Sequence, residues 1–248
     1  MLVTKIVIVI PAYLARETLP AVLERLPAHV HEEVYRIVVV EDIGPNMERS
    51  TTPELSSVYP KLKILVHDRN RGYGAAQKTG FRHALELGAD VVALLHADGQ
   101  YAPEIIADLY SPLVRGDADV VLGSRMHSVR SAWRGGMPLY KVIANVSLTR
   151  IENIAYGMRM SEYHSGYMLY SRRALEAIPF ERLSDTFHFD GEMLLMAGKC
   201  GLVVADMPIP THYGDEDSHL QPIKYGIEVL NVIRKNFVGY YDALLDGR

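Results

Sequence analysis

The first half of the chain alternates short apolar runs with segments of helical periodicity. The apolar runs cover Lys5–Ile10, Arg36–Val40, Lys63–Val66, Val91–Leu95 and Asp119–Leu122. Continuous runs of this length, rich in β-branched residues, are typical of strands buried on both faces of a parallel sheet. Because helical segments separate them, the pattern predicts an α/β fold, doubly wound around a mainly parallel central sheet with flanking helices.

The pattern changes after about Gly123. Residues 126–165 are helical and loop-rich in character, and a strand, a helix and a strand are then predicted at Gly166–Ser171, Asp190–Cys200 and Leu202–Ile209. Apolar residues from Pro222 to Leu244 recur every three to four positions, which predicts an amphipathic C-terminal helix. We expect that helix to pack on the body of the protein rather than on a membrane.

Bulk properties narrow the classes of function. The 248 residues are 48% hydrophobic, and a net charge of −4 argues against binding nucleic acid through bulk electrostatics. The single cysteine, Cys200, has no partner for an internal disulfide, which fits a reducing compartment. No apolar run approaches the roughly 20 residues that span a bilayer. We therefore expect a cytoplasmic protein, with a peripheral position at the inner face of the membrane left open.

Polar residues follow three of the apolar runs. Glu41-Asp42, His67-Asp68, and His96 with Asp98 each stand where a predicted strand ends. The carboxyl ends of parallel strands meet at one edge of a sheet, where α/β proteins bind ligands. Like charges packed together cost stability unless a ligand or cation offsets them, so this edge is the candidate site.

The segment Asp98-Gly99-Gln100 suits a divalent cation. On an extended backbone, Asp98 and Gln100 would point to the same side, and Gly99 would permit close backbone approach. Two oxygen donors can hold a hard cation that keeps waters and bridges a diphosphate. The plainer alternative is a turn in which Asp98 caps the helix that Pro103 opens.

Two glycine-containing segments suit phosphate groups. Asn70–Lys78 lies between a strand and a helix, so Arg71 or Lys78 would assist a phosphate at the helix N-terminus. Arg125 follows the fifth strand, ahead of a basic and aromatic segment that contains Arg130, Trp133, Arg134, Tyr140 and Lys141. An ordinary turn and a solvated loop are the structural alternatives. Neither Gly-x-Gly-x-x-Gly after the first strand nor a P-loop motif occurs, which excludes those two nucleotide sites.

Asp190 and Glu192 open a predicted helix, where acidic side chains also complement the helix dipole. If the substrate that receives a group is a hydroxyl, one of the two would act as its general base. His164 and His212 are further candidates. The polar segment Pro210–His219 is expected to be a mobile loop.

Five motifs and two weaker ones occur in an order that resembles one known family. They are Ile10-Pro11-Ala12-Tyr13, Val40-Glu41-Asp42, Asn70-x-Gly72-x-Gly74-Ala75, Ala97-Asp98-Gly99-Gln100 with Pro103-Glu104, and Gly123-Ser124-Arg125, then more weakly Ser165-Gly166-Tyr167 and Phe189-Asp190-Gly191-Glu192. Over roughly residues 5–215 the chain resembles glycosyltransferase family 2 proteins with the GT-A fold. Within that family it is most similar to the branch related to dolichyl- and polyprenyl-phosphate sugar synthases.

The resemblance implies a role for each matching residue. The nucleotide-sugar site would comprise Pro11, Tyr13, Glu41, Asp42, Asn70, Gly72, Lys78, His96 and Asp98, with the first four around a uracil or guanine nucleoside. Asp98 and Gln100, with His96, would hold Mg²⁺ or Mn²⁺ against the donor diphosphate. Asp98, Arg125, Asp190 and Glu192 would be the catalytic residues, Arg125 by binding a phosphate. The implied reaction is inverting, metal-dependent transfer of a hexose from a UDP- or GDP-sugar to a polyprenyl or dolichyl phosphate at the cytosolic membrane face.

Two departures from the family pattern leave points open. His96 stands where the family usually has the first Asp of Asp-x-Asp, so His96 either ligates the metal or contacts the donor alone. Glu41-Asp42 replaces the usual Asp-Asp pair. A phosphate acceptor is already anionic and needs no general base, in which case Asp190 and Glu192 only position groups.

The resemblance also implies how the chain is divided. We expect a GT-A domain over residues 1–215, with a nucleotide-sugar half at 1–125 and an acceptor half at 126–215. A C-terminal loop and helix would cover 216–248. The oligomeric state is left open.

Three other functions remain as alternatives. One is a glycosyltransferase that acts on a soluble or polysaccharide hydroxyl. Another is a non-catalytic nucleotide-sugar-binding protein, which the departure at His96 favours. A sugar nucleotidyltransferase is weaker, because the segment after the first strand lacks a glycine-rich, basic signature.

Overall fold

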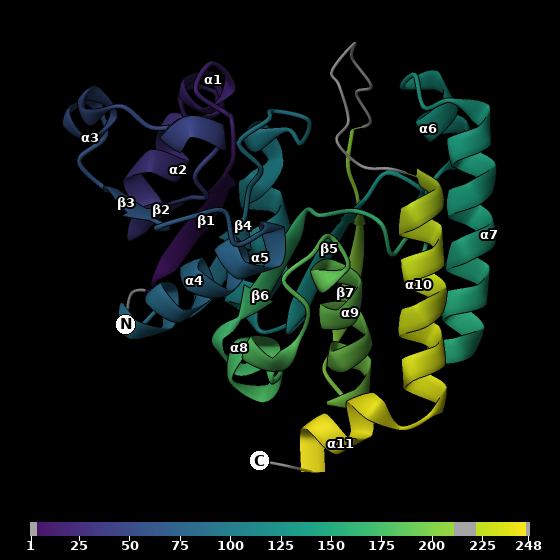
Figure 1. Ribbon diagram of the computed structural model, residues 1–248. Helices are drawn as coiled ribbons and strands as arrows, with labels where there is room; N and C mark the ends of the chain where they lie inside the picture. Colours follow the sequence, from purple (N-terminus) through teal and green to yellow (C-terminus); the bar gives the residue numbers. More distant parts are fainter. Residues whose placement is uncertain (1–3, 211–221, 247–248) are drawn as a thin grey trace.

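The computed structural model describes residues 4–210 and 222–246 (Figure 1). Its centre is a seven-stranded sheet in the order β3-β2-β1-β4-β6-β5-β7. The strands are β1 (Ile6–Ala12), β2 (Arg36–Glu41), β3 (Leu62–Val66), β4 (Val91–Leu94), β5 (Val120–Ser124), β6 (Met168–Ser171) and β7 (Val204–Pro208). Only β6 runs antiparallel to its neighbours among these strands. The predicted α/β fold around a mainly parallel sheet is confirmed.

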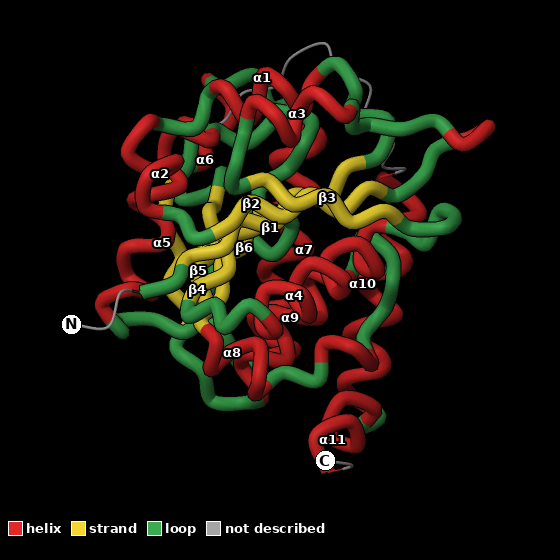
Figure 2. Tube along the Cα trace, turned by 90° about the vertical axis from the view of Figure 1, so that its left-hand side faces the viewer, coloured by secondary structure: helices red, strands yellow, loops and turns green. Residues whose placement is uncertain are grey.

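Helices cover both faces of this sheet, as Figure 2 shows. They are α1 (Thr18–Glu24), α2 (Ala28–Glu33), α3 (Pro53–Val58), α4 (Tyr73–Glu86), α5 (Ile106–Arg115), α6 (Val129–Arg134), α7 (Leu139–Tyr156), α8 (Arg172–Ala177), α9 (Phe189–Lys199), α10 (Pro222–Phe237) and α11 (Tyr240–Asp246), with short 3₁₀ turns at Pro45–Met47, Pro103–Ile105 and Phe180–Arg182. Successive residues of β1 point to opposite faces of the sheet and pack in two different hydrophobic cores. Ile8 packs with α1, α2 and α5, and Val9 with α4 and α9. This pleat explains why the strand is apolar at every position.

The two halves of the chain share the one sheet. The half after residue 125 supplies β6 and β7, and β6 lies between β4 and β5. Leu169 of β6 lies opposite Ala93 of β4 on one side and Val121 of β5 on the other. Pairing between segments this far apart leaves no local signal in the sequence, so the order of the strands was not predictable from the run of motifs.

The prediction of one continuous C-terminal helix from Pro222 to Leu244 is wrong. The chain forms α10 and α11, separated at Val238-Gly239, and Gly239 has φ +76°. Glycine adopts this conformation without steric cost, and it ends the first helix. The expected polar loop over 210–219 and its His212 lie outside the described residues. Within the described residues, helices are too short or too polar to cross a bilayer.

Candidate functional site

The ends of β1, β2 and β4 lie next to one another at the carboxyl edge of the sheet. β1 pairs in parallel with β2 on one side, where Ala12 lies opposite Glu41, and with β4 on the other. Tyr13 is 41% exposed at this edge, and Asp98 is also exposed. The structure therefore brings the predicted residues at these strand ends to one rim.

Asp98 lies in a turn rather than on an extended strand. β4 ends at Leu94, Gly99 has φ +76°, and the Asp98 carboxylate accepts a hydrogen bond from the backbone N–H of Gln100 at 3.0 Å. The expectation that the strand pleat aligns Asp98 with Gln100 is wrong, because the backbone turns between them. Nor does Asp98 cap the helix after Pro103. The turn presents a single exposed carboxylate at the rim.

The turn after β4 offers the Asp98 carboxylate as a ligand for a divalent cation. Among residues 4–210 and 222–246, no group of three His, Cys, Asp or Glu side chains is placed to hold a metal ion. Mg²⁺ in phosphate-binding sites typically uses one or two carboxylates and takes its other ligands from phosphate and water. The exposed Asp98 meets that requirement, and its Oδ1 is the oxygen engaged by Gln100.

His96 belongs to a hydrogen-bonded network that joins three distant segments. Its Nε2 lies 2.8 Å from the Tyr73 hydroxyl and 3.1 Å from the carbonyl of Gly166. The Tyr73 hydroxyl donates to Oδ2 of Asp190 at 2.8 Å, and the Gln77 amide donates to Oδ1 of Asp190 at 2.8 Å. Two predicted residues, His96 and Asp190, are thus linked through Tyr73, which the sequence analysis did not select.

The network favours one tautomer of His96. The Tyr73 O–H is directed to Asp190, so the Tyr73 oxygen is left to accept a proton from the imidazole. The carbonyl of Gly166 can only accept as well. Both contacts therefore require a hydrogen on Nε2 of His96, and a neutral ring then carries its lone pair on Nδ1. Nε2 is occupied within the protein, which leaves Nδ1 as the ring atom able to act on a ligand.

Burial sets the charge properties of the same network. Desolvation raises the pKa of the Asp190 carboxyl, although hydrogen bonds from Gln77 and Tyr73 and the nearby His96 oppose this. Burial and the neighbouring Asp190 also raise the pKa of Tyr73 well above its ordinary value. Tyr73 therefore stays protonated as a donor, and Asp190 is a better proton acceptor than an exposed aspartate.

Gly166 explains the weaker motif around it. A Cβ at this position would lie 2.6 Å from Cε1 of His96. The Gly166 N–H donates to the Tyr101 hydroxyl at 2.9 Å, and the Tyr101 ring packs edge-on against His96. A glycine is required here because the backbone itself forms one wall around the imidazole.

Glu41 has a structural role that the predicted nucleoside contact does not describe. Its side chain is fully buried. It accepts hydrogen bonds from the backbone N–H groups of Ser50 and Thr51, the Thr51 hydroxyl and the Arg49 guanidinium. Burial by itself raises the pKa of Glu41, but the bonds from Thr51 and Arg49 bring it below the ordinary value. Both oxygens anchor the 49–51 loop, which gives Glu41 a positioning role, and its nucleoside contact stays a prediction.

Asp42 holds the loop that leads into α4. It is 4% exposed and accepts from the backbone N–H groups of Arg71 and Gly72, each at 2.8 Å, and from Nδ1 of His67 at 2.9 Å. Gly72 has φ +96°, a conformation that favours glycine. The neighbouring Asn70 is exposed on this loop. Asp42 therefore positions the loop, and Asn70 is one of its exposed residues.

Lys78 and Glu192 both stabilise the loop at 183–185. Lys78 is 6% exposed, and its ammonium pairs with Asp185 at 2.7 Å and with a backbone carbonyl of the same loop. Glu192 is 2% exposed and accepts from the backbone N–H of Ser184 at 2.8 Å and the Tyr241 hydroxyl at 2.7 Å. Partners inside the fold occupy both groups, so Lys78 and Glu192 have structural roles here, and the phosphate contact of Lys78 and the base role of Glu192 stay predictions.

Arg125 is held by a buried acid that the sequence analysis missed. Its guanidinium pairs with Glu162 and donates to the carbonyl of His164 at 2.7 Å, and its backbone N–H donates to Glu162 at 2.9 Å. Asn145 also donates to Glu162, at 2.8 Å. Burial raises the pKa of Glu162, but Arg125 outweighs that effect and lowers it overall. Glu162 therefore orients Arg125 at the end of β5.

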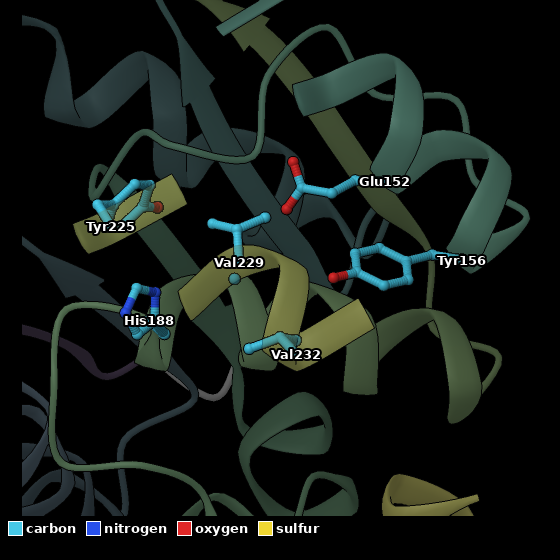
Figure 3. Close-up of a pocket in the computed structure, with 7 residues that line it drawn as sticks. Glu152, Tyr156, His188, Tyr225, Val229 and Val232 are labelled. Atoms are coloured by element: carbon cyan, nitrogen blue, oxygen red, sulfur yellow. The ribbon is translucent and has the colours of Figure 1, made fainter. Parts of the chain in front are cut away.

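A small pocket lies between α7, α9 and α10 (Figure 3). It is lined by Glu152, Tyr156, His188, Gly191, Tyr225, Val229 and Val232. The Tyr225 ring packs on His188 with centroids 4.9 Å apart, and its hydroxyl lies 3.1 Å from Nδ1 of His164. His188 immediately precedes α9 and Gly191 lies in its first turn, so the pocket borders the start of this helix.

Tyr73, Gln77 and Glu162 are the residues that sequence reasoning did not select. Tyr73 and Gln77 lie four apart on α4, a spacing that places them on one face, but nothing in the local sequence points that face toward Asp190. Glu162 stands in a loop without periodicity. A single chain offers no local signal for partners separated by 37 to 117 positions.

Comparison with known proteins identifies the family. The family model described as glycosyl transferase family 2 matches residues 7–178. UDP-N-acetylglucosamine–dolichyl-phosphate N-acetylglucosaminyltransferase of Methanococcus voltae is 28% identical over 220 residues, which cover 84% of this chain and 86% of the relative. Undecaprenyl-phosphate mannosyltransferase of Micrococcus luteus is 27% identical over 243 residues, which cover 97% of each chain.

A solved structure supports the fold independently. Glucosyl-3-phosphoglycerate synthase of Mycobacterium tuberculosis, in complex with UDP, superposes with a TM-score of 0.67 at 15% identity, covering 94% of this chain and 80% of that one. The central sheet, its strand-end rim and the predicted GT-A fold agree with this likeness. The match of the family model over most of the sequence shows that the chain belongs to glycosyl transferase family 2.

Proposed function

We propose that this glycosyltransferase moves a hexose from a UDP- or GDP-sugar to the phosphate of a polyprenyl or dolichyl phosphate. The relatives from Methanococcus voltae and Micrococcus luteus are named for lipid-phosphate acceptors of this kind and align over most of the chain. The structural observation that carries the proposal is the exposed Asp98 carboxylate at the strand-end rim, beside the His96–Tyr73–Asp190 network.

The donor would bind along this rim. Tyr13 is exposed, Pro11 is half-buried and Asn70 is exposed on the loop that Asp42 positions, which supports these three as the proposed nucleoside contacts. The backbone N–H groups at the start of α4 carry the partial positive charge that favours an anion. Arg125, oriented by Glu162, would contact a phosphate of the donor or of the lipid.

Asp98 would hold Mg²⁺ or Mn²⁺ together with oxygens of the donor diphosphate. Such an ion supplies Lewis-acid stabilisation of the departing diphosphate. The likeness to glucosyl-3-phosphoglycerate synthase agrees with this, since that enzyme has been crystallised with Mg²⁺ and UDP and with Mn²⁺ and UDP. His96 would contact the donor through Nδ1, because Nε2 is bonded to Tyr73 and Gly166.

The acceptor would approach from the side of α9. A lipid phosphate is anionic near neutral pH and attacks the anomeric carbon without losing a proton, so Asp190 would position Tyr73 and His96 rather than act as a base. Attack from the face opposite the departing diphosphate inverts the anomeric centre. Because the acceptor is a lipid, we place the working protein at the cytosolic face of a membrane.

A hydroxyl acceptor is the second candidate, and one observation favours it. Burial raises the pKa of Asp190, which makes this carboxylate a stronger base toward a hydroxyl proton. Asp190→Asn separates the two functions. Transfer to a phosphate should fall only modestly, whereas transfer to a hydroxyl should be lost.

The direct test is a transfer assay with radiolabelled donors. Purified protein is incubated with UDP- and GDP-hexoses, with undecaprenyl or dolichyl phosphate in detergent, and with Mn²⁺, Mg²⁺ or EDTA. We expect one donor to label the lipid phosphate in a reaction that EDTA abolishes. Labelling of a sugar hydroxyl but of neither prenyl phosphate would replace this proposal with the second candidate.

A further inference from the structure

The outer helices carry an unusual number of exposed apolar side chains. On α6 and α7 these are Trp133, Leu139, Tyr140, Ile143, Ile151 and Ile154, and on α10 they are Ile227, Leu230 and Phe237. Ile154 is 84% exposed and Phe237 is 73% exposed. In Figure 1, α6, α7 and α10 form the side of the molecule farthest from α3. Apolar groups gathered on one exposed side of a protein mark an interaction site.

The spacing of these residues places them on a single face of each helix. Tyr140, Ile143, Ile151 and Ile154 on α7 are separated by three, eight and three positions, so they follow one helical stripe. On α10, Ile227, Leu230 and Phe237 are separated by three and seven positions. The inner faces of both helices serve the fold instead, for example through Glu152 and Val229 in the pocket. The outward stripes are therefore a second apolar face on helices that already have a buried one.

Exposed charge on α6, α7 and the residues beside them has one sign, whereas α10 carries Glu228 together with Arg234 and Lys235. Between residues 126 and 159 the basic residues are Arg130, Arg134, Lys141, Arg150 and Arg159, and the single acidic residue is Glu152. Glu152 is 2% exposed, so the exposed charge of this segment is wholly positive. The chain as a whole has a net charge of −4. Cations are thus concentrated on the side that also exposes apolar groups.

We propose that the outward faces of α6, α7 and α10 bind the surface of an anionic lipid bilayer. A helix with an apolar stripe and flanking Lys and Arg lies in the plane of the interface, with the stripe among the acyl chains and the cations at the headgroups. Trp133 and Tyr140 are of the types enriched at that boundary. The choice of a bilayer over a protein partner follows from this charge complementarity and rests on the lipid acceptor of the proposed function.

The pocket gives this surface a connection to the chemistry. Its walls come from the inner faces of α7 and α10, and its remaining residues are His188, which precedes α9, and Gly191, which follows Asp190. Asn236 of α10 donates to the carbonyl of Ala155 in α7 at 3.1 Å, which ties the two helices together. A protein docked through these helices holds the first turn of α9 close to the bilayer, where a lipid phosphate is displayed.

Vesicle cosedimentation tests the membrane-binding face. Wild-type protein should bind vesicles of phosphatidylcholine with 30% phosphatidylglycerol, and bind pure phosphatidylcholine at least tenfold more weakly. Ile143→Asp with Ile154→Asp should reduce binding to the anionic vesicles at least tenfold, and so should Arg134→Glu with Arg150→Glu. The matched control is Val58→Asp, because Val58 is 66% exposed on α3 and should leave binding unchanged.

Several results would overturn the inference. One is a wild-type protein that ignores anionic vesicles, and another is an Ile143→Asp/Ile154→Asp variant, folded by circular dichroism, that binds them as the wild type does. Light scattering that shows a dimer, dissociated by the same pair of substitutions, would assign the face to a second copy of the chain.

A short-chain, water-soluble prenyl phosphate separates this inference from the proposed function. The Ile143→Asp/Ile154→Asp variant should transfer sugar to that acceptor at the wild-type rate and lose at least tenfold with a long-chain acceptor in vesicles. Transfer to the soluble acceptor by a wild-type protein that does not bind vesicles overturns the membrane-binding face alone. Vesicle binding without transfer to any prenyl phosphate overturns the proposed function alone.

Discussion

The ends of β2 and β4 carry similar acidic residues at the same rim, yet the fold treats them differently. After β2, Glu41 and Asp42 are buried, and backbone N–H groups of two loops bond to their oxygens. After β4, Asp98 is exposed in a turn and accepts one local hydrogen bond. The comparison shows that a carboxylate surrounded by hydrogen-bond donors of the protein stabilises the fold. A carboxylate without such donors remains available to a ligand.

Of the changes at the rim, Asp98→Asn should reduce activity the most while leaving stability unchanged. Loss of the carboxylate weakens cation binding and the stabilisation of the departing diphosphate, so we expect kcat/KM for transfer to fall about 10²–10³-fold. The melting temperature should not change, because the side chain is exposed. The control is Asp68→Asn, since Asp68 is an exposed acid after β3 that pairs with Arg71 at 2.7 Å. Equal losses in both variants would remove the special role of Asp98.

Glu41→Gln should have the opposite profile. The amide places an NH₂ group against the N–H donors of the 49–51 loop, and an unsatisfied buried contact costs about 1–3 kcal/mol. We expect the free energy of unfolding in urea to fall by that amount, while activity per folded molecule at low temperature changes little. Glu48→Gln, an exposed position in the neighbouring loop, is the control. Unchanged stability would show that Glu41 is free for a ligand after all.

The cost of Glu41→Gln should depend on pH. The pKa of Glu41 is lower in the folded protein than in the unfolded chain, where it is about 4.3. Its contribution to stability is therefore fully present above the unfolded value and is lost as the pH falls through the lower folded value. Urea unfolding at pH 7, 5, 4 and 3 should show the gap between wild type and variant narrowing below about pH 4. A gap that stays constant would mean that the charge of Glu41 is not what the loop requires.

Tyr73→Phe should give a smaller loss of activity than Asp98→Asn. It tests a third acid, Asp190, which accepts a hydrogen bond from the Tyr73 hydroxyl. The substitution removes the hydroxyl that joins Asp190 to His96 and leaves the ring in place. We expect kcat to fall about tenfold with KM for the donor little changed, since outer-shell partners of functional groups contribute effects of this order. The pH profile of kcat should also shift, because Asp190 loses the hydrogen bond from Tyr73 that lowers its pKa. Phe187→Leu, which changes the ring stacked on Tyr73 and keeps the hydroxyl, is the control.

Agreement between sequence and structure was best where the signal was local and repeated. The apolar runs at β1, β2 and β4 occur within one or two residues of their predicted bounds. The main errors in the predicted backbone path occur at single glycines. Gly99 turns the chain between Asp98 and Gln100, and Gly239 divides the C-terminal helix, because a single residue with positive φ redirects the backbone without disturbing the apolar pattern around it.

The sequence by itself determined the class of fold, the family and the rim where the acidic residues gather, because periodicity and motif order are written along the chain. Only the tertiary structure decided what each acid does. Glu41, Asp42 and Glu192 are enclosed by donors from loops and a helix that lie elsewhere in the chain, whereas Asp98 is not enclosed. The physical reason is that burial and hydrogen-bond partners belong to segments brought together by folding, and no local pattern reports which segments will meet.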